Sequence, residues 1–405
     1  MSDTHITRPL VAGFSLYRGL ERNVYLLFVI RIINRFGDFV QLLLVLILTG
    51  KLGLSPAQAG FFVSSSVIAT MLGQVASGVV ADRWGRKTPL VVAQAVVSAT
   101  YLLCALLFTT APSLIPFLIL FSSPFRGGTS PLTNTMVADS SSTEHLSRSF
   151  SLLYLGTNIG VAIGPVAASF LYTRSIVLLF FLSSALIAIS TILLLVSIKE
   201  KGPSHQEEHS SSSSSRSLRI PPVLLIFFGF FALYGLAYAQ NTFTLPLQFA
   251  ALYGQEVGPS RYALLMSVNA VTVLVATAFL TTWTHRLGQL GSMALAMLFY
   301  VIGYGMYAWC SAYVFFLVAT CIWTFGEILM ATNANVFVNA YAPRSLRSRC
   351  NAYITTASSL GHALAPTVGG LLLITSNYAQ LWLLCAGLSF LLGCGYIVLN
   401  KYLES

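Results

Sequence analysis

The segment GVVADRWGRKTPL, residues 78–90, stands between two long apolar runs and carries its glycines and charges in a fixed order. Gly78 allows a neighbouring helix to approach closely, and Gly85 allows a tight turn. Asp82 can pair with a basic neighbour or face the N-terminus of a helix. The spacing between the two glycines is too long for a phosphate-binding loop. We therefore interpret the segment as a short basic turn that connects two helices.

The composition places those helices in a membrane. The chain has 405 residues, of which 56% are hydrophobic and 8% are charged, whereas a soluble domain carries about 25% charged residues. A membrane-spanning helix needs about 20 mainly apolar residues. The sequence contains twelve such runs, at 24–48, 57–80, 89–110, 114–138, 149–172, 175–198, 221–250, 260–284, 289–310, 312–341, 350–375 and 378–400. The first is too long for the core of a cleavable signal peptide.

The net charge of +10 does not indicate nucleic-acid binding here. Arg and Lys concentrate in the N-terminal segment and in every second connection, which is typical of the cytoplasmic side of a membrane protein. Both termini are therefore expected in the cytoplasm of a multi-pass protein of the cell membrane, with a bacterial inner membrane as its site. The six cysteines lie mostly within apolar runs and have no metal-binding spacing, so no metal site is expected.

The linker KEKGPSHQEEHSSSSSSRSLRI, residues 199–220, divides the runs six and six. Its charge and serine content cannot build a core, so it is predicted to be flexible and cytoplasmic. The predicted organisation is an N-terminal segment at 1–23, a six-helix bundle at 24–198, the linker, and a second six-helix bundle at 221–405.

The two halves are related in sequence at an offset of 201 residues. Chance similarity between apolar helices explains shared leucines, but it explains poorly the matching of rarer residues. The matched pairs include Arg148 with Arg349, Gly160 with Gly361, Pro165 with Pro366, and Arg126 with Glu327. Internal repeats of this kind are typical of transporters, whose substrate site lies between the repeats near the bilayer midplane.

The order G-x-x-x-D-R-x-G-R-K in a six-plus-six chain resembles the signature loop of the major facilitator superfamily. This resemblance implies two six-helix bundles with a pseudo-two-fold repeat, and a loop that gates the cytoplasmic side. It implies that Asp82 faces the start of the run at 350–375, and that Arg83, Arg86 or Lys87 meets Asp139, with Arg148 close by.

The run at 149–172 contains GTNIGVAIGPVAAS, residues 156–169. Gly156, Gly160 and Gly164 recur every four residues and form a smooth face for close helix packing, and Pro165 adds a bend. The motif resembles that of the exporters of the family, especially drug/proton antiporters, although it ends in Ala-Ser instead of Gly-Gly. It favours export over uptake.

The stretch RIINRFGDF, residues 31–39, places several polar groups inside the first apolar run. Arg31, Asn34, Arg35 and Asp38 are spaced to share one face of a helix, which cannot face lipid. The alternative is that Arg35 and Asp38 only neutralise each other.

Two further charges lie deep in apolar runs. Arg126 is about 18 Å from the outer end of its run, at 1.5 Å per residue, and Glu327 lies at a matching depth. Arg126 resembles an arginine to which the family gives a role in proton transfer. By the same resemblance, the runs that carry these charges and RIINRFGDF line one central cavity, with a nominal charge of +1 when Asp38 and Glu327 are ionised.

These residues define the functional prediction. A partly desolvated carboxyl group can take up a proton near neutral pH, so Asp38 and Glu327 are candidate coupling sites, and His362 is either a proton relay or a packing residue. Arg31, Asn34 and Arg35 are candidate substrate ligands. Tyr234, Tyr238 and Asn241 either line the cavity or cross-link helices.

We expect a proton-coupled secondary transporter that exports a small amphipathic, anionic or zwitterionic compound. The alternative is proton-coupled uptake of a small metabolite or peptide. An enzyme is not expected, because the sequence has no nucleophile–base pair and no HExxH motif. No cofactor is expected, since the proton gradient supplies the energy, and the partners are the substrate, protons and the lipid bilayer around a monomer.

Overall fold

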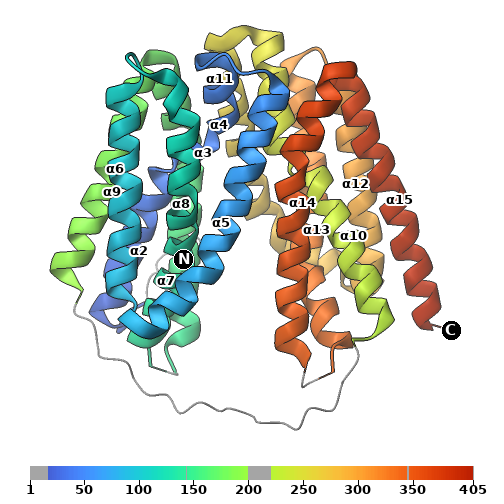
Figure 1. Ribbon diagram of the computed structural model, residues 1–405. Helices are drawn as coiled ribbons and strands as arrows, with labels where there is room; N and C mark the ends of the chain where they lie inside the picture. Colours follow the sequence, from blue (N-terminus) through green and yellow to red (C-terminus); the bar gives the residue numbers. More distant parts are fainter. Residues whose placement is uncertain (1–16, 143, 199–219, 344–345, 405) are drawn as a thin grey trace, which may run out of the picture. The chain divides into compact units, whose positions relative to one another are not determined.

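The computed structural model describes residues 17–142, 144–198, 220–343 and 346–404, and every regular element in these ranges is a helix (Figure 1). The predicted all-helical membrane architecture is confirmed. The predicted linker, apart from residue 220, and most of the predicted N-terminal segment lie outside the described residues.

The helices follow the predicted apolar runs. Those before the linker are α2 Arg22–Phe36, α3 Phe39–Leu42, α4 Leu44–Leu46, a π-helix at Ile47–Lys51, α5 Pro56–Trp84, α6 Lys87–Leu107, α7 Ile115–Ser140, α8 Leu146–Arg174 and α9 Ile176–Ser197. Those after it are α10 Pro222–Tyr238, α11 Gln240–Thr284, α12 Gly288–Trp309, α13 Tyr313–Tyr341, α14 Arg347–Thr375 and α15 Tyr378–Glu404. Short 3-10 turns occupy Pro112–Leu114 and His285–Leu287.

Ten segments of the described chain are long and apolar enough to cross a membrane. One of them, Pro222–Thr277, has 56 residues, and its backbone leaves helical geometry at Gly254 with φ 77°, so its length suits two crossings. Helix α7 is not among the ten although it has 26 residues, because its charged residues, serines and prolines lower its mean hydropathy. Counting that segment twice and adding α7 gives the twelve predicted crossings.

The first predicted helix, 24–48, is not continuous, which corrects the sequence-based expectation. Helix α2 ends at Phe36, and the Gly37 N–H donates to the Ile33 carbonyl oxygen at 2.9 Å. A side chain at Gly37 would lie 3.1 Å from Leu186 of α9. The chain therefore breaks its helix where α9 packs closely, and Asp38 lies in the break instead of on the helical face that carries Arg31 and Arg35.

The contacts divide the chain into two compact units. Unit 1 comprises Met1–Gln41, Ala69–Ala167 and Ser175–Ser212, and unit 2 comprises Leu42–Ile68, Ala168–Arg174 and Ser213–Ser405. Each unit is described by itself. The placement of the predicted bundle boundaries at 24–198 and 221–405 stays a prediction.

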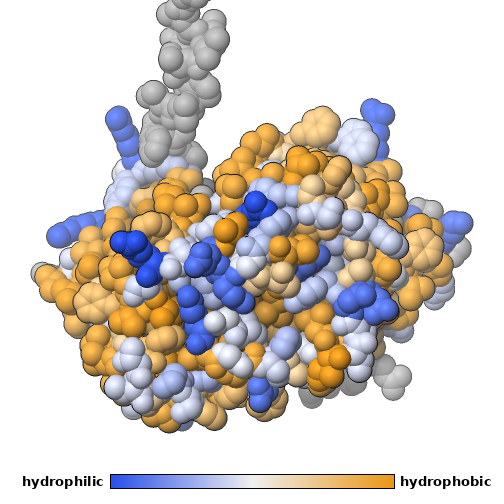
Figure 2. All heavy atoms as spheres, turned by 90° about the horizontal axis from the view of Figure 1, so that it is seen from above, coloured by the Kyte–Doolittle hydropathy of each residue, from blue (hydrophilic) through white to orange (hydrophobic). Residues whose placement is uncertain are grey.

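Large apolar side chains cover much of the surface, as orange areas in Figure 2 show. Val75 of α5 is 75% exposed, Leu391 of α15 is 67% exposed and Ile374 of α14 is 66% exposed. An exposed apolar surface of this extent favours contact with lipid over contact with water. The distribution therefore agrees with helices that face a bilayer.

The core of unit 1 is aliphatic and brings five helices together around α2. Leu27 and Ile30 of α2 pack with Leu132 of α7, Leu153 of α8 and Leu194 of α9. The core of unit 2 is aromatic instead. Tyrosine and tryptophan side chains from α12, α13 and α15 are buried there, among them Tyr300, Tyr304, Tyr307, Trp323 and Trp382. These two cores hold the helices that carry the predicted site residues.

Candidate functional site

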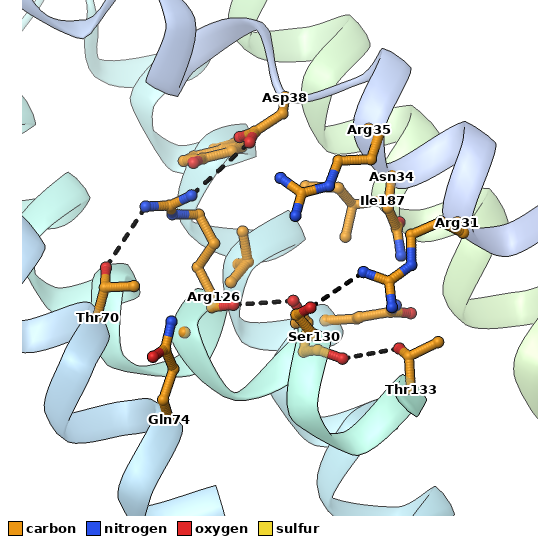
Figure 3. A pocket seen from close by; sticks show the side chains of 15 residues that line it. Arg31, Asn34, Arg35, Asp38, Thr70, Gln74, Arg126, Ser130, Thr133 and Ile187 are labelled. Atoms are coloured by element: carbon orange, nitrogen blue, oxygen red, sulfur yellow. Dashed lines mark hydrogen bonds and ion pairs between the residues drawn. The ribbon is translucent and has the colours of Figure 1, made fainter. Parts of the chain in front are cut away.

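Unit 1 contains a cavity of about 230 Å³ that is lined by charged and amide side chains (Figure 3). We call it the arginine cavity, after Arg31, Arg35 and Arg126, which line it together with Asn34 and Asp38. Every one of these five residues was predicted from the sequence as a site residue. The structure brings them together although the α2 helix ends before Asp38.

Both terminal nitrogens of the Arg31 guanidinium group form hydrogen bonds with α7. One terminal nitrogen donates to Ser130 Oγ at 3.0 Å, and the other donates to Asn134 Oδ1 at 2.6 Å. The residue is 7% exposed. Two hydrogen bonds to fixed partners keep this charge in one position, as a binding group requires.

Arg126 is the partner of Asp38. Its Nη1 lies 3.7 Å from Asp38 Oδ2, and its Nη2 donates to Thr70 Oγ1 at 3.4 Å. The guanidinium group of Arg35 also points into the cavity in Figure 3, but it makes no hydrogen bond or ion pair with the described residues. The alternative that Arg35 and Asp38 only neutralise each other is therefore wrong for this structure.

The charges of the arginine cavity do not cancel. Three guanidinium groups and one carboxylate line it, which leaves a formal charge of +2 when all four are ionised. The predicted value of +1 included Glu327, which belongs to unit 2. Unpaired positive charge in a low-dielectric surrounding attracts an anion strongly.

Glycines place the helices of unit 1 close enough to build this cavity. A side chain at Gly127, next to Arg126, would lie 2.1 Å from the Thr70 carbonyl oxygen, so α5 and α7 touch through their backbones. A side chain at Gly160 of α8 would lie 2.5 Å from Arg35 Cβ and 2.9 Å from the Phe36 nitrogen. The predicted smooth face of Gly156, Gly160 and Gly164 therefore packs against α2, and Gly160 sits directly behind Arg35.

We expect Gly160→Ala to lower the thermal unfolding midpoint of the protein in detergent. The new methyl group forces α2 away from α8, and overpacking of this kind costs about 1–3 kcal/mol. The matched control is Gly78→Ala, because Gly78 lies within α5 and a side chain there would meet nothing within 4 Å. Equal stability of the two variants would contradict the close contact of Gly160.

The turn between α5 and α6 has the predicted form at Gly85, whose φ is 76°. Arg86 Nε lies 3.1 Å from Asp139 Oδ2 at the end of α7, as the resemblance implied for one of three basic residues. Lys87 instead donates to the carbonyl oxygens of Leu195 and Ile198 at 2.9 and 2.7 Å, where its charge suits the end of α9.

Four other residues of the gating prediction have no such contacts. Gly78 is exposed, and a side chain there would meet nothing within 4 Å among the described residues, so the expected close helix contact at this glycine stays a prediction. The side chains of Asp82, Arg83 and Arg148 are exposed and make no ion pair with the described residues. Their gating roles stay predictions.

Unit 2 holds Glu327 in a cluster of neutral polar groups. Tyr238 Oη of α10 donates to Glu327 Oε1 at 2.7 Å, and Asn269 Nδ2 of α11 donates to Glu327 Oε2 at 2.7 Å. Within the described part of the chain, Glu327 makes no ion pair. A carboxylate at this depth without a cation is costly and marks a functional residue in most membrane proteins.

Tyr234 and Asn241 cross-link helices. Tyr234 Oη lies 2.9 Å from Tyr300 Oη, and Asn241 Nδ2 donates to Tyr304 Oη at 2.9 Å. Both residues are buried, at 9% and 1% exposure. Of the two predicted alternatives, the bonds of Tyr234 Oη and Asn241 Nδ2 to α12 agree with cross-linking, and a contact with substrate stays a prediction. Tyr238 differs, since its hydroxyl group bonds the Glu327 carboxylate.

His362 of α14 contacts Tyr238, with 5.6 Å between the ring centroids. Its Nδ1 lies 2.8 Å from the Ser358 carbonyl oxygen one turn earlier, so Nδ1 carries the hydrogen. The position agrees with packing against Tyr238, and the proton-relay role stays a prediction.

Sequence reasoning missed several residues that hold the site charges. Ser130 and Asn134 follow Arg126 at intervals of four, so a polar stripe along α7 was a usable signal. Asn269 of α11 had no such signal, because it is a single amide in an apolar run. Its role follows only from its contact with Glu327.

Membrane-length helices that enclose charged groups define this chain as a multi-pass membrane protein. The model of the Major Facilitator Superfamily matches residues 27–366 and 249–402. The chain belongs to this superfamily. Its members are transporters and not enzymes.

Individual relatives are distant. The uncharacterized MFS-type transporter YttB of Bacillus subtilis (strain 168) is 23% identical over 362 residues, covering 87% of this chain and 89% of that protein. A Na(+), Li(+), K(+)/H(+) antiporter of Planococcus maritimus is 22% identical over 337 residues, with coverage of 76% and 80%. The crystal structure of the nucleoside transporter NupG superposes with a TM-score of 0.78 at 18% identity, covering 94% of this chain and all of that one.

Proposed function

We propose that this protein is a proton-coupled secondary active transporter that exports a small anionic, zwitterionic or amphipathic compound by alternating access. The observation that carries the proposal is the arginine cavity, which is lined by three guanidinium groups and one carboxylate. A cationic substrate would meet uncompensated positive charge there. An acidic group of the substrate would find two arginines, the anchored Arg31 and the unpaired Arg35.

The size of the cavity supports a small binding group. Its volume of about 230 Å³ is below the range of about 300–1,000 Å³ that encloses a drug-sized ligand. A carboxylate or phosphate group with a few waters fits such a space. The apolar part of an amphipathic substrate would then extend beyond it.

Two carboxyl groups are proposed to couple transport to protons. Asp38 pairs with Arg126, so protonation of Asp38 would release the arginine for another anion. Glu327 has only neutral donors, so protonation would remove an uncompensated charge. The proton gradient is the energy source without a cofactor, and the working unit is a monomer in the bacterial inner membrane with both termini in the cytoplasm.

Export is proposed from the glycine motif of α8, which resembles that of drug/proton antiporters. Its glycines pack on α2 beside Arg35, so movement of α8 would reach the binding group directly. The loop at 78–90 would gate the cytoplasmic side through its charges. Uptake by symport remains the alternative, because the same parts serve it when proton and substrate bind together.

Exchange of inorganic cations for protons is a second candidate. The specific observation is the similarity to the Na(+), Li(+), K(+)/H(+) antiporter of Planococcus maritimus. In this chain the oxygen atoms suited to such a cation surround Glu327, where Tyr238 and Thr324 supply hydroxyl oxygens. Hard monovalent and divalent cations prefer oxygen ligands of this kind.

Reconstituted vesicles with a pH gradient imposed in each direction test the proposal. We expect an anionic or zwitterionic compound in a substrate panel to move against its gradient, in the direction opposite to protons. Movement with protons would establish symport. Proton release on addition of Na+, Li+ or K+, without transport of any organic compound, would replace the proposal with cation exchange.

A further inference from the structure

Each carboxyl oxygen of Glu327 has one polar partner from a neighbouring helix. Glu327 Oε1 accepts from Tyr238 Oη at 2.7 Å, and Oε2 accepts from Asn269 Nδ2 at 2.7 Å. Only an ionised carboxylate accepts at both oxygens without donating. With one neutral donor on each oxygen, the arrangement suits the ionised form of Glu327.

Asn269 is shared between Glu327 and a second acceptor. Its Nδ2 also lies 2.9 Å from Thr324 Oγ1. The Thr324 hydroxyl group donates its hydrogen to the Thr320 carbonyl oxygen at 2.6 Å, so Thr324 Oγ1 accepts from Asn269. The two hydrogens of one amide nitrogen are thus both used on α13, one on the Glu327 carboxylate and one on Thr324 one turn earlier.

No cation takes part in this cluster among the described residues. The titratable groups close enough to interact with the Glu327 charge are Tyr234 and Tyr238 of α10 and Tyr300 of α12, and His362 of α14 lies next to Tyr238. Tyr234 and Tyr300 bond each other at 2.9 Å, and His362 packs on the Tyr238 ring. The carboxylate therefore depends on Tyr238 and Asn269 for its hydrogen bonds.

A proton on Oε2 makes the present orientation of the amide unfavourable. The new O–H bond uses a proton from water and turns Oε2 into a donor, which then faces the donor Nδ2. Rotation of the amide by half a turn exchanges Nδ2 for Oδ1, which accepts from Oε2. Oδ1 then also faces Thr324 Oγ1, and the Thr324 hydrogen can swing from the Thr320 carbonyl oxygen to Oδ1.

We propose that Asn269 is a positioning residue whose amide reverses when Glu327 is protonated. This reversal changes the hydrogen bond between Asn269 and Thr324, which lies one turn before Glu327 on α13. The inference rests on the proposed role of Glu327 in proton coupling and adds the residue through which the proton changes the contact between α11 and α13. In this structure Asn269 Nδ2 donates to Thr324 Oγ1. After protonation of Glu327, Thr324 Oγ1 would instead donate to Asn269 Oδ1.

Infrared spectroscopy of the full chain in lipid vesicles tests this without a known substrate. Titration of native protein between acid and alkaline pH should show a carboxyl C=O band that is absent from Glu327→Gln. A change in an amide C=O band should appear at the same midpoint, because Oδ1 gains a donor. Asn269→Leu should abolish the amide change and raise the midpoint of the carboxyl band by about one to two pH units, since the ionised form loses one of two donors.

The matched control is Asn339→Leu. Asn339 exchanges hydrogen bonds with Asn351 of α14, with Asn351 Nδ2 donating to Asn339 Oδ1 at 2.8 Å, so its removal also breaks an amide link between helices. It should leave both bands and their midpoint unchanged. If Asn269→Leu does not fold, the isosteric Asn269→Asp replaces it. That variant should also lack the amide change and should raise the midpoint, because two carboxyl groups then share one proton.

An unchanged midpoint with a persistent amide band in Asn269→Leu overturns the role of Asn269, as does the absence of any titrating Glu327 band in native protein. Both results are independent of transport. If the bands behave as expected but vesicles show no pH-driven movement of any compound, the amide reversal stands and the proposed proton-coupled transport fails.

Discussion

Vesicles that contain Glu327→Gln should exchange substrate across the membrane but should no longer accumulate it in response to a pH gradient. Glutamine has nearly the shape of glutamate, and its amide can still accept from Tyr238 or bond Asn269. It cannot take up a proton. The variant therefore removes the proposed coupling step while the contacts of α13 with α10 and α11 remain.

The expected loss is large. A difference of one pH unit is worth about 1.4 kcal/mol per proton, which supports about a tenfold substrate gradient when one proton exchanges for one substrate. In Glu327→Gln that substrate gradient should fall to the level of empty vesicles. The rate of exchange without a pH gradient should stay within about twofold of the native rate. The reason is that the substitution removes a negative charge that has no cationic partner among the described residues, so no charge is left unpaired.

Radiotracer uptake with and without an imposed pH gradient measures both quantities. Glu256→Gln is the matched control, because Glu256 is exposed and lies outside the cluster. It should behave as the native protein does. Full accumulation by Glu327→Gln would remove Glu327 from the coupling mechanism and leave Asp38 as the remaining candidate.

Hydropathy was sufficient to predict the helices, and it was insufficient to predict where they break. Length and apolar content located α5, α6 and α12 to within a few residues. The interruption at Gly37 lies where Leu186 of α9 approaches the backbone closely. A contact between residues so far apart in sequence leaves no trace in the local pattern, so the helix appeared continuous.

The identity of the site residues was predicted better than their pairing. Charges are so costly in a membrane that Arg31, Arg35, Asp38 and Arg126 were recognisable one by one. Their partners depend on which side chains reach one another across the packed helices. Thus Asp38 pairs with Arg126 instead of Arg35, and Asn269 was missed because a single amide has no distinguishing context until Glu327 is placed beside it.

The two charged sites differ in a way that bears on coupling. In unit 1 the acid is paired with an arginine and positive charge is in excess, whereas in unit 2 the acid is bonded by neutral groups only. An anion suits the first site and a proton suits the second. Under the proposed function, the arginines of unit 1 bind the substrate and Glu327 of unit 2 takes up a proton, so substitutions of these side chains should affect affinity and coupling separately.

Arg35→Gln should weaken the binding of an anionic substrate while leaving the fold intact. Arg35 makes no hydrogen bond or ion pair with the described residues, so its removal orphans no partner and relieves repulsion from the other arginines. A hydrogen bond to a charged group contributes about 1.5–3 kcal/mol, which corresponds to a loss of affinity of about 10- to 150-fold. Arg31→Gln should cost similar affinity and also stability, because it leaves Ser130 and Asn134 without their donor.

Titration calorimetry with the substrate found in the vesicle screen gives the affinity, and thermal unfolding in detergent gives the stability. Arg174→Gln is the matched control, since Arg174 is exposed at the end of α8, and it should change neither quantity. The contrast between the two cavity arginines is the decisive result. If Arg35→Gln binds the anion as tightly as native protein does, the unpaired charge is not a substrate ligand, and the arginine cavity must bind through Arg31 and Arg126 alone.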